Sequence, residues 1–306
     1  MIFVILSSHL SGRRARLLIG AGGCVALAAL VLVWSPWRSK ELWTVPQGEP
    51  RTLEALNREA ADVAEHTVEA FPHDADSHAL NANARLFSGK LADAAESWQR
   101  CLQLDPNRPG AYDGISLVAW EEGDLERVVA TCQKALELKS VVPCVYDRLA
   151  RALLEMGQAE EAIAASQRAV GRWPRSSEAH LLLGQGYIQS QEYAKAQECF
   201  LRVVEISPEN PQPYYGLATA SAKLGQRDKA RQYQEEFRKW IAVDRAAFEA
   251  LTRSSNLQRD LADRRTSTAQ IYAAAASIYQ RHGYREQADR LRRRAAILDR
   301  KSTLSP

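Results

Sequence analysis

The side chains that could carry acid–base or metal chemistry are few and scattered along this 306-residue chain. Only one short segment combines histidines with carboxylates, His73-Asp74-Ala75-Asp76-Ser77-His78. Aspartate and serine between a turn and a helix are ordinary N-capping residues, so the segment predicts a helix cap rather than a metal site. His78 and His180 also occupy equivalent positions of an internal repeat, which indicates a packing role.

Nucleophilic chemistry has no better support. No C-x-x-C pair occurs among the five cysteines, which are Cys24, Cys101, Cys132, Cys144 and Cys199. We interpret them as small apolar core residues. The chain has no G-x-S-x-G, H-E-x-x-H or P-loop sequence. The sequence therefore predicts no catalytic residue, no metal, no cofactor and no small-molecule substrate, and the protein is expected not to be an enzyme.

The charge of the whole chain points to no particular partner. Its 40 basic and 37 acidic side chains leave a net charge of +3, which does not favour nucleic acid or acidic substrates. Apolar residues make up 46% and charged residues 25%, as in ordinary folded proteins. We therefore expect a folded chain with no nucleic-acid partner.

An uncharged run of 18 residues, Leu17–Trp34, lies near the N-terminus. At about 1.5 Å per residue, a helix of this length spans about 27 Å, close to the hydrocarbon core of a bilayer. Arginines precede the run, at Arg13, Arg14 and Arg16, and tryptophans follow it. The pattern predicts a single-pass membrane protein with a cytoplasmic N-terminus and the remaining chain on the outer, periplasmic-like side.

Other interpretations of this run stay open. A cleaved signal or transit segment needs small residues near its cleavage site, whereas Trp34-Ser35-Pro36-Trp37 follows the run. A lipoprotein signal would place Cys24 after the apolar run, but most of the run follows it. A buried core helix would lie outside the repeat register. The basic residues are only slightly biased toward the N-terminal side, so the orientation rests on a small asymmetry.

A period of 34 residues organises most of the chain. Glycine marks it at Gly89, Gly123, Gly157 and Gly225, with Gln191 in the slot between the last two. Proline marks it at Pro72, Pro106, Pro174 and Pro208. Five residues after each glycine slot stand Ala94, Val128, Ala162, Ala196 and Ala230. Agreement at so many positions indicates internal repeats.

This pattern resembles the tetratricopeptide repeat (TPR) family, whose units follow W-x2-L-G-x2-Y, then A-x3-F, then A and P. The clearest match is Ser177–Asn210, with Leu183-Gly184, Tyr187, Ala196, Phe200 and Pro208. The resemblance implies two antiparallel helices per unit, A and B, in an all-α TPR superhelix, a right-handed α-solenoid. The N-terminal transmembrane helix predicted from residues 17–34 precedes it. Small residues let the two helices approach, and the glycine ends helix A in a left-handed cap.

The expected organisation follows from the anchor and the repeats. We predict a cytoplasmic tail at 1–16, a transmembrane anchor at 17–34, a linker at 35–50, a capping helix at 51–74, five TPR units at 75–244 and a C-terminal helical cap at 245–306. The five units are Ala75–Arg108, Pro109–Val142, Pro143–Ser176, Ser177–Asn210 and Pro211–Asp244. The cap contains a degenerate TPR-like unit centred on Gly283, with Tyr272, Ala276, Tyr279 and Ala288 in register.

In this family the concave face, lined by helix A, typically receives a peptide or a partner helix. Counting along each helix A predicts a partner-binding groove made of Asn83, Phe87, Leu117, Trp120, Arg151, Leu154, Gln185, Ile188, Tyr215 and Lys223. Asp113, Glu121, Asp147 and Glu155 fall in the same slots. Phe87 and Trp120 are the strongest candidates, because large aromatic side chains dominate interface energetics. The alternative for each apolar member is packing between neighbouring units.

Basic residues gather near the C-terminus. The segment Arg281–Lys301 has eight basic and three acidic residues, and its predicted basic patch comprises Arg290, Arg292, Arg293 and Arg294. This patch is either the solvated outer face of a capping helix or a contact for anionic lipid or an acidic partner.

Three functions compete on these observations. The leading one is a membrane-tethered scaffold that binds a protein or peptide partner in the TPR groove. Families of this layout include bacterial assembly factors for cytochrome c and companions of the secretion channel, so the resemblance suggests an assembly or secretion factor without choosing between them. The alternative is a surface-binding protein that uses its basic C-terminal helix on anionic lipid or an acidic partner. An enzyme without a local motif is the third.

Overall fold

The computed structural model describes residues 44–46, 48, 50, 52–140, 142–253 and 257–302, with no side-chain detail at 244–253, 257–259 and 300–302. Every described helix belongs to the unit Gln47–Pro306. The predicted anchor, Leu17–Trp34, and the tail before it lie outside the described residues. Among the helices that are described, none is both long and apolar enough to cross a bilayer.

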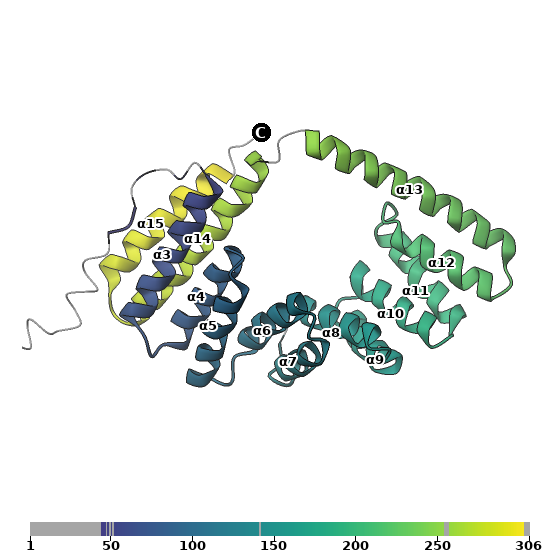
Figure 1. The fold of residues 1–306 in the computed structure, drawn as a ribbon, viewed down its shortest axis with the longest axis horizontal. Coiled ribbons are helices and arrows are strands. Elements are labelled where there is room, and N and C mark those ends of the chain that lie inside the picture. The colour runs from purple at the N-terminus through teal and green to yellow at the C-terminus, as the bar shows by residue number, and fades with distance from the viewer. Residues whose placement is uncertain are drawn as a thin grey trace, which may run out of the picture. The chain divides into compact units, whose positions relative to one another are not determined.

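The described residues form thirteen helices and no strand, which confirms the all-α prediction (Figure 1). A single helix, α3 (Leu53–Ala70), comes first. Five helix pairs follow: α4 (Ala75–Phe87) and α5 (Leu91–Leu104), α6 (Pro109–Glu122) and α7 (Leu125–Glu137), α8 (Pro143–Glu155) and α9 (Ala159–Arg172), α10 (Ser177–Gln189) and α11 (Tyr193–Ile206), α12 (Gln212–Lys223) and α13 (Arg227–Arg253). The chain then forms a last pair, α14 (Leu257–Arg281) and α15 (Arg285–Ser302).

The turn inside each pair uses the left-handed backbone that the glycine period predicts. Gly89, Gly123 and Gly157 have φ values of 72°, 75° and 75°. Gln191, which replaces glycine in the fourth pair, adopts the same conformation with φ of 61°. A side chain disfavours this region, so Gln191 holds the turn at a cost that glycine avoids.

Close approach between helices explains the small residues of the repeat. Ala162 and Ala196 are fully buried where helix B meets helix A. The Phe200 ring of α11 lies against two glycines, Gly184 of α10 and Gly216 of α12, and a Cβ added at Gly184 would come within 2.6 Å of that ring. One aromatic side chain therefore fixes the spacing of three consecutive helices.

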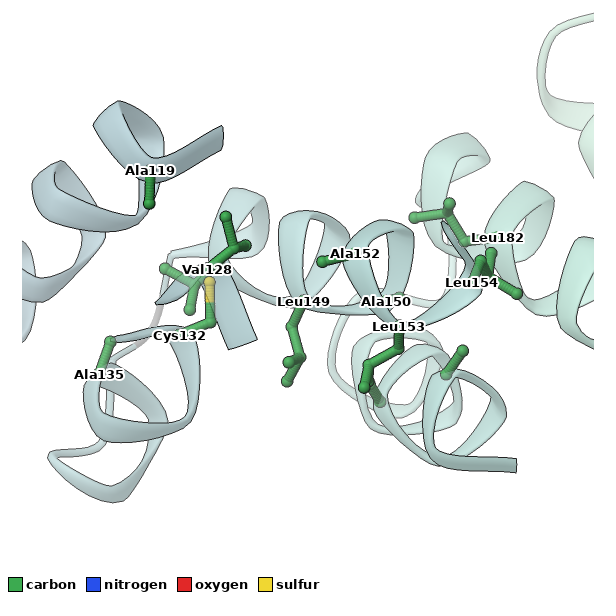
Figure 2. Close-up of a cluster of buried hydrophobic side chains, with 13 residues drawn as sticks. Ala119, Val128, Cys132, Ala135, Leu149, Ala150, Ala152, Leu153, Leu154 and Leu182 are labelled. Carbon is green, nitrogen blue, oxygen red and sulfur yellow. The ribbon is translucent and has the colours of Figure 1, made fainter. Parts of the chain in front are cut away.

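The core is continuous from one pair to the next. In Figure 2, Val128 and Cys132 from α7, Leu149 and Leu153 from α8, and Leu182 from α10 belong to one cluster of buried side chains. Cys101 and Cys132 are buried, as predicted for small core residues. Cys144 is exposed at the start of α8, so the core interpretation is wrong for this cysteine. Cys199 is half-buried, and Cys24 lies outside the described residues.

The last helix pair does not cap the last repeat. α14 packs on α15, on α3 and on α4, whereas neither α14 nor α15 has a packing interface of comparable size with α12 or α13. Figure 1 shows α3, α14 and α15 side by side. The expectation that 245–306 covers the C-terminal end of the repeats is therefore wrong. Helix α3 has an apolar face, with Leu56, Ala60 and Val63 buried, and α14 covers it instead.

The direction of α14 also differs from that of the repeat. Thr268 lies next to Leu56 near the start of α3, and the Tyr279 ring lies 4.9 Å from the Phe71 ring at the end of α3. Helix α14 is therefore parallel to α3. An A helix of a TPR unit is antiparallel to its B helix, so α14 does not supply the missing A helix of α3 in the usual orientation.

A buried ion pair fastens α15 to α3. Arg294 donates from Nε and Nη2 to the two carboxylate oxygens of Glu59, at 2.5 and 2.9 Å, and its Nη2 also donates to the carbonyl of Gly48 at 2.7 Å. The exposed fractions of the two side chains are 2% and 7%. Bidentate arginine–carboxylate pairs of this kind are strong and directional. Burial, together with the adjacent Glu59 charge, raises the pKa of Tyr272 beside this pair.

Candidate partner-binding surface

The A helices of the repeats form one surface. Arg148, near the start of α8, donates to Asp113, near the start of α6, at 2.6 Å. Gln189, at the end of α10, donates to the carbonyl of Leu154, near the end of α8, at 3.0 Å. Neighbouring A helices therefore run in the same direction. Their solvent-facing residues on α4, α6, α8, α10 and α12 are called the A-helix surface below.

At its first helix this surface is partly covered. Asn83 and Phe87 of α4 are both half-buried. The Arg264 guanidinium of α14 lies 5.8 Å from the centre of the Phe87 ring and donates to the Phe87 carbonyl at 2.6 Å. The predicted strongest aromatic contact is therefore already occupied on one side by the chain's own C-terminal helix pair.

The central part contains both surface and core residues. Leu117 and Trp120 of α6 are half-buried, and Trp120 packs against the cluster of Figure 2. Leu154 is only 7% exposed and belongs to that cluster, where it lies beside Leu182. The prediction that Leu154 faces a partner is therefore not supported, because helix A turns this position toward the next unit.

The other predicted members lie closer to solvent. Arg151 is exposed and forms an ion pair with Glu178 of α10, and Gln185 is exposed on the same helix. Ile188 is half-buried against the core of the fourth unit. On α12, Lys223 is exposed, and Tyr215 is 64% exposed.

Tyr215 is the most open aromatic residue of the predicted set. Its ring centre lies 5.6 Å from that of Phe237 on α13, so the two rings form an aromatic edge at the last repeat. Phe237 was missing from the predicted set, because it stands on a B helix. Because Phe87 and Trp120 are half-buried, Tyr215 replaces them as the strongest candidate for an aromatic contact with a partner.

On the central A helices some charged side chains have a partner of opposite charge and others have none among the described residues. Arg148 bonds both Asp113 and the Ser116 hydroxyl, at 2.6 Å each. Asp147, next to Arg148, has no hydrogen bond or ion pair among the described residues. Burial, and then the neighbouring Glu178 charge, raise the pKa of Asp147 to about 6. Because Asp147 is half-buried and unpaired, a cation placed beside it would stabilise its ionised carboxylate more than that of an already paired residue.

The sequence contains a signal for the Arg148 pair that periodicity alone did not reveal. Asp113 and Arg148 are 35 residues apart, which is one repeat plus one residue. Opposite charges at that separation fall on facing positions of consecutive A helices. A search for opposite charges 35 residues apart would have found this contact.

Two of the described histidines occupy equivalent structural positions of the repeat. His78 and His180 contact the carbonyls of Pro72 and Pro174 at 2.9 and 3.0 Å, and the Tyr214 hydroxyl donates to Pro208 in the same slot. This confirms the predicted packing role. Asp74 accepts a hydrogen bond from the Asp76 N–H at 2.8 Å, as an N-cap should. Within the described ranges no cluster of three or more histidine, cysteine or acidic side chains could hold a metal ion.

The predicted basic patch divides into two kinds of residue. Arg290, Arg292 and Arg293 are exposed on α15, where Arg290 and Arg292 pair with Glu286 and Asp289 on the same helix. Arg294 is buried in its pair with Glu59, so it contributes to docking of α15 and not to an exposed patch. Arg294 is buried because it continues the buried stripe of α15, three residues after Leu291 and four before Leu298.

Helix pairs with a glycine turn, tight A–B packing and parallel A helices define an all-α helical-repeat protein. The sequence profile of the tetratricopeptide repeat matches residues 79–143, 148–211 and 182–242, which together cover just over half of the chain. The chain therefore belongs to the TPR family.

Solved structures give the same fold. YrrB, described as a TPR protein with an unusual peptide-binding site, is 22% identical with a TM-score of 0.56 over 63% of this chain and 100% of YrrB. MamA from Desulfovibrio magneticus RS-1 is 21% identical, with a TM-score of 0.50 over 56% of this chain and 96% of its own. PilF of Pseudomonas aeruginosa is 15% identical, with a TM-score of 0.52 over 64% and 90%. A search of curated proteins gave no match.

Proposed function

We propose that this TPR protein is a protein–protein interaction scaffold, tethered to a membrane by residues 17–34, that binds a peptide or helix of its partner on the A-helix surface. The observation that carries the proposal is the open aromatic edge at Tyr215, which is 64% exposed on the A-helix row. Solvent-exposed aromatic side chains are the usual anchors of protein interfaces. The likeness to YrrB, which has a peptide-binding site, is consistent with this proposal.

Affinity capture tests the binding role. The full-length chain, solubilised from membranes, is the bait, and Tyr215→Ala is compared with Leu201→Ala. Leu201 is a matched control, because it is a large apolar residue, 43% exposed, on the B helix α11. We expect Tyr215→Ala to lose captured protein while Leu201→Ala keeps it. Equal capture by both variants would contradict a partner site at this edge.

The tether is a separate part of the proposal and has its own test. The run Leu17–Trp34 supports it through length and apolarity. Full-length protein should stay with membranes in alkaline carbonate, whereas a chain that starts at residue 51 should not. Release of the full-length chain by carbonate would contradict a spanning helix.

The proposed orientation places the repeats on the outer side. Cys144 offers a reporter, because it is the exposed one of the four described cysteines. A membrane-impermeant maleimide added to intact cells should label the wild-type chain and not Cys144→Ser. Labelling that requires lysis would place the repeats on the inner side.

A second candidate function uses α15. Its exposed arginines Arg290, Arg292 and Arg293 leave this helix basic, which favours contact with anionic lipid or an acidic partner. Arg294 of α15 donates a hydrogen bond to the Gly48 carbonyl. Gly48 follows the end of the proposed anchor, Trp34, by fewer than twenty residues in the sequence. Binding of anionic vesicles at low salt, lost when these three arginines become glutamine, is the expected result. An unmutated chain that ignores such vesicles would remove this candidate.

A further inference from the structure

The charges on the A helices and B helices of the central repeats differ. Helix α6 carries three acidic and no basic side chains, α10 carries one acidic side chain, and α8 carries two of each kind. The B helices α7, α9 and α11 each carry two acidic and two basic side chains. The acidic excess of these units therefore lies on their A helices, although the whole chain is slightly basic.

The two basic side chains of α8 are already paired. Arg148 is bound to Asp113 and Ser116, and Arg151 is paired with Glu178. Neither is within bonding distance of Asp147, although both lie on the same helix and lower the pKa of its carboxyl electrostatically. Asp147 thus remains half-buried and without a hydrogen bond or ion pair in the described part of the chain.

Two more carboxylates extend the acidic area. Glu121 at the end of α6 and Glu155 at the end of α8 are exposed and have no ion pair among the described residues. Glu121 directly follows Trp120 at the end of α6, where Trp120 and Leu117 are half-buried. The surface therefore combines apolar side chains with unpaired negative charge.

We propose that the A-helix surface of α6, α8 and α10 takes a basic amphipathic segment of the partner protein, with lysine or arginine side chains pairing with Asp147, Glu121 and Glu155. This inference rests on the proposed scaffold function and adds the charge class of the partner. Charge complementarity selects this occupant, because an acidic segment would meet uncompensated carboxylates, and like charges brought together in an interface are strongly disfavoured. The apolar side chains of the segment contact Trp120 and Leu117.

The titration of Asp147 is consistent with this occupant. Its pKa is about 6, raised by burial and by Glu178 of α10 and lowered by Arg151 and Arg148 of α8. Asp113 of α6 is paired with Arg148. A bound cation favours the ionised carboxylate and lowers this pKa. Binding of the basic segment should therefore weaken as the pH falls below about 6.

The test uses the full-length chain in detergent and three labelled peptides that share one apolar helical pattern. Their polar positions carry lysine, glutamine or glutamate. We expect the lysine peptide to bind at least about tenfold tighter than the glutamine peptide at low salt, since several pairs act together, and the glutamate peptide to bind least. A lysine peptide with its apolar positions scrambled should bind weakly.

Asp147→Asn should reduce the preference for lysine over glutamine by about threefold or more, whereas Glu160→Gln, on the exposed start of α9, should leave it unchanged. Circular dichroism melting shows that both variants are folded. Equal binding of the lysine and glutamine peptides, or an unchanged preference in Asp147→Asn, would overturn the charge assignment alone.

Two other outcomes are informative. If no peptide of any charge binds, the proposed scaffold function fails, and the charge assignment fails with it. If the full-length chain self-associates in sedimentation and Asp147→Asn abolishes this, the occupant is a second copy and the assignment to a partner protein is wrong.

Discussion

In the repeat array each A helix lies parallel to the next A helix, whereas α14 runs antiparallel to α4, the A helix that it contacts. The start of α14 meets the end of α4 through Arg264 and Phe87, and its end meets the start of α4 through His282 and Asp74, 2.7 Å apart. Both regions obey the same glycine and alanine register within a pair. The register therefore fixes how two consecutive helices pack, but not where the finished pair docks.

Different interactions hold the two regions together. Units of the array join through repeated apolar contacts such as the cluster of Figure 2. The α14–α15 pair joins α3 through contacts that occur once: the buried Glu59–Arg294 pair and the stack of His282 on Phe71, with ring centres 4.2 Å apart. Docking of the last pair should thus be sensitive to single substitutions, and stacking of the array should be more tolerant.

The largest expected effect comes from breaking the buried pair. Arg294→Met leaves the Glu59 carboxylate buried without its partner, which should destabilise the fold by about 3–5 kcal/mol. Chemical denaturation measures the loss. The double variant with Glu59→Met should recover most of it, because two apolar side chains can replace a buried ion pair. A loss below about 1 kcal/mol for Arg294→Met would show that α15 is not held at this site.

Equivalent alanines compare the packing of the two regions directly. Ala196 of α11 and Ala288 of α15 occupy the same repeat slot, and both are fully buried. Replacing either with leucine should overpack its helix pair and cost about 1–3 kcal/mol. Thermal melting of the two variants measures this. A normal melting temperature for Ala288→Leu alone would mean that the last pair lacks the tight packing of the array.

Carboxylates provide a third comparison, because Glu59 is paired and Asp147 is not. The folded-state pKa of Asp147, about 6, lies above its ordinary value of 3.8. The protonated carboxyl is tolerated in the folded state, so its contribution to folding stability is fully present below pH 3.8. This contribution is lost as the pH rises through the folded-state pKa of about 6. Asp147→Asn should therefore stabilise the chain by about 1–2 kcal/mol at pH 7, with no gain at pH 3.5. Melting curves at both pH values decide this, and a destabilised variant at pH 7 would contradict an unpaired Asp147.

The smallest effect is expected on the exposed side of α15. Converting Arg290, Arg292 and Arg293 to glutamine removes surface ion pairs, which should change stability by less than about 1 kcal/mol in total. The matched contrast is Arg294 on the same helix. If the triple variant unfolds as readily as Arg294→Met, the division of α15 into a buried and an exposed face is incorrect.

Much of the fold was predictable because a repeat carries its own register. The glycine and proline grid located the helix pairs, and the alanine slots located their close contacts. The docking of α14–α15 was not predictable, because it depends on pairs such as Glu59–Arg294 that are 235 residues apart and occur once. No period reports such a contact. Leu154 and Arg294 were predicted to be exposed but are buried. The position of a residue within the repeat does not determine which neighbouring helix will cover its side chain.

Hydrogen exchange of the full-length chain, with and without a saturating basic amphipathic peptide, tests the central claim most directly. The account predicts that added protection falls on the A helices α6, α8 and α10, and on α12, where Tyr215 lies, with the B helices α7 and α9 and the α14–α15 pair unchanged. Protection confined to α14–α15, or to the B helices, would contradict binding on the A-helix surface.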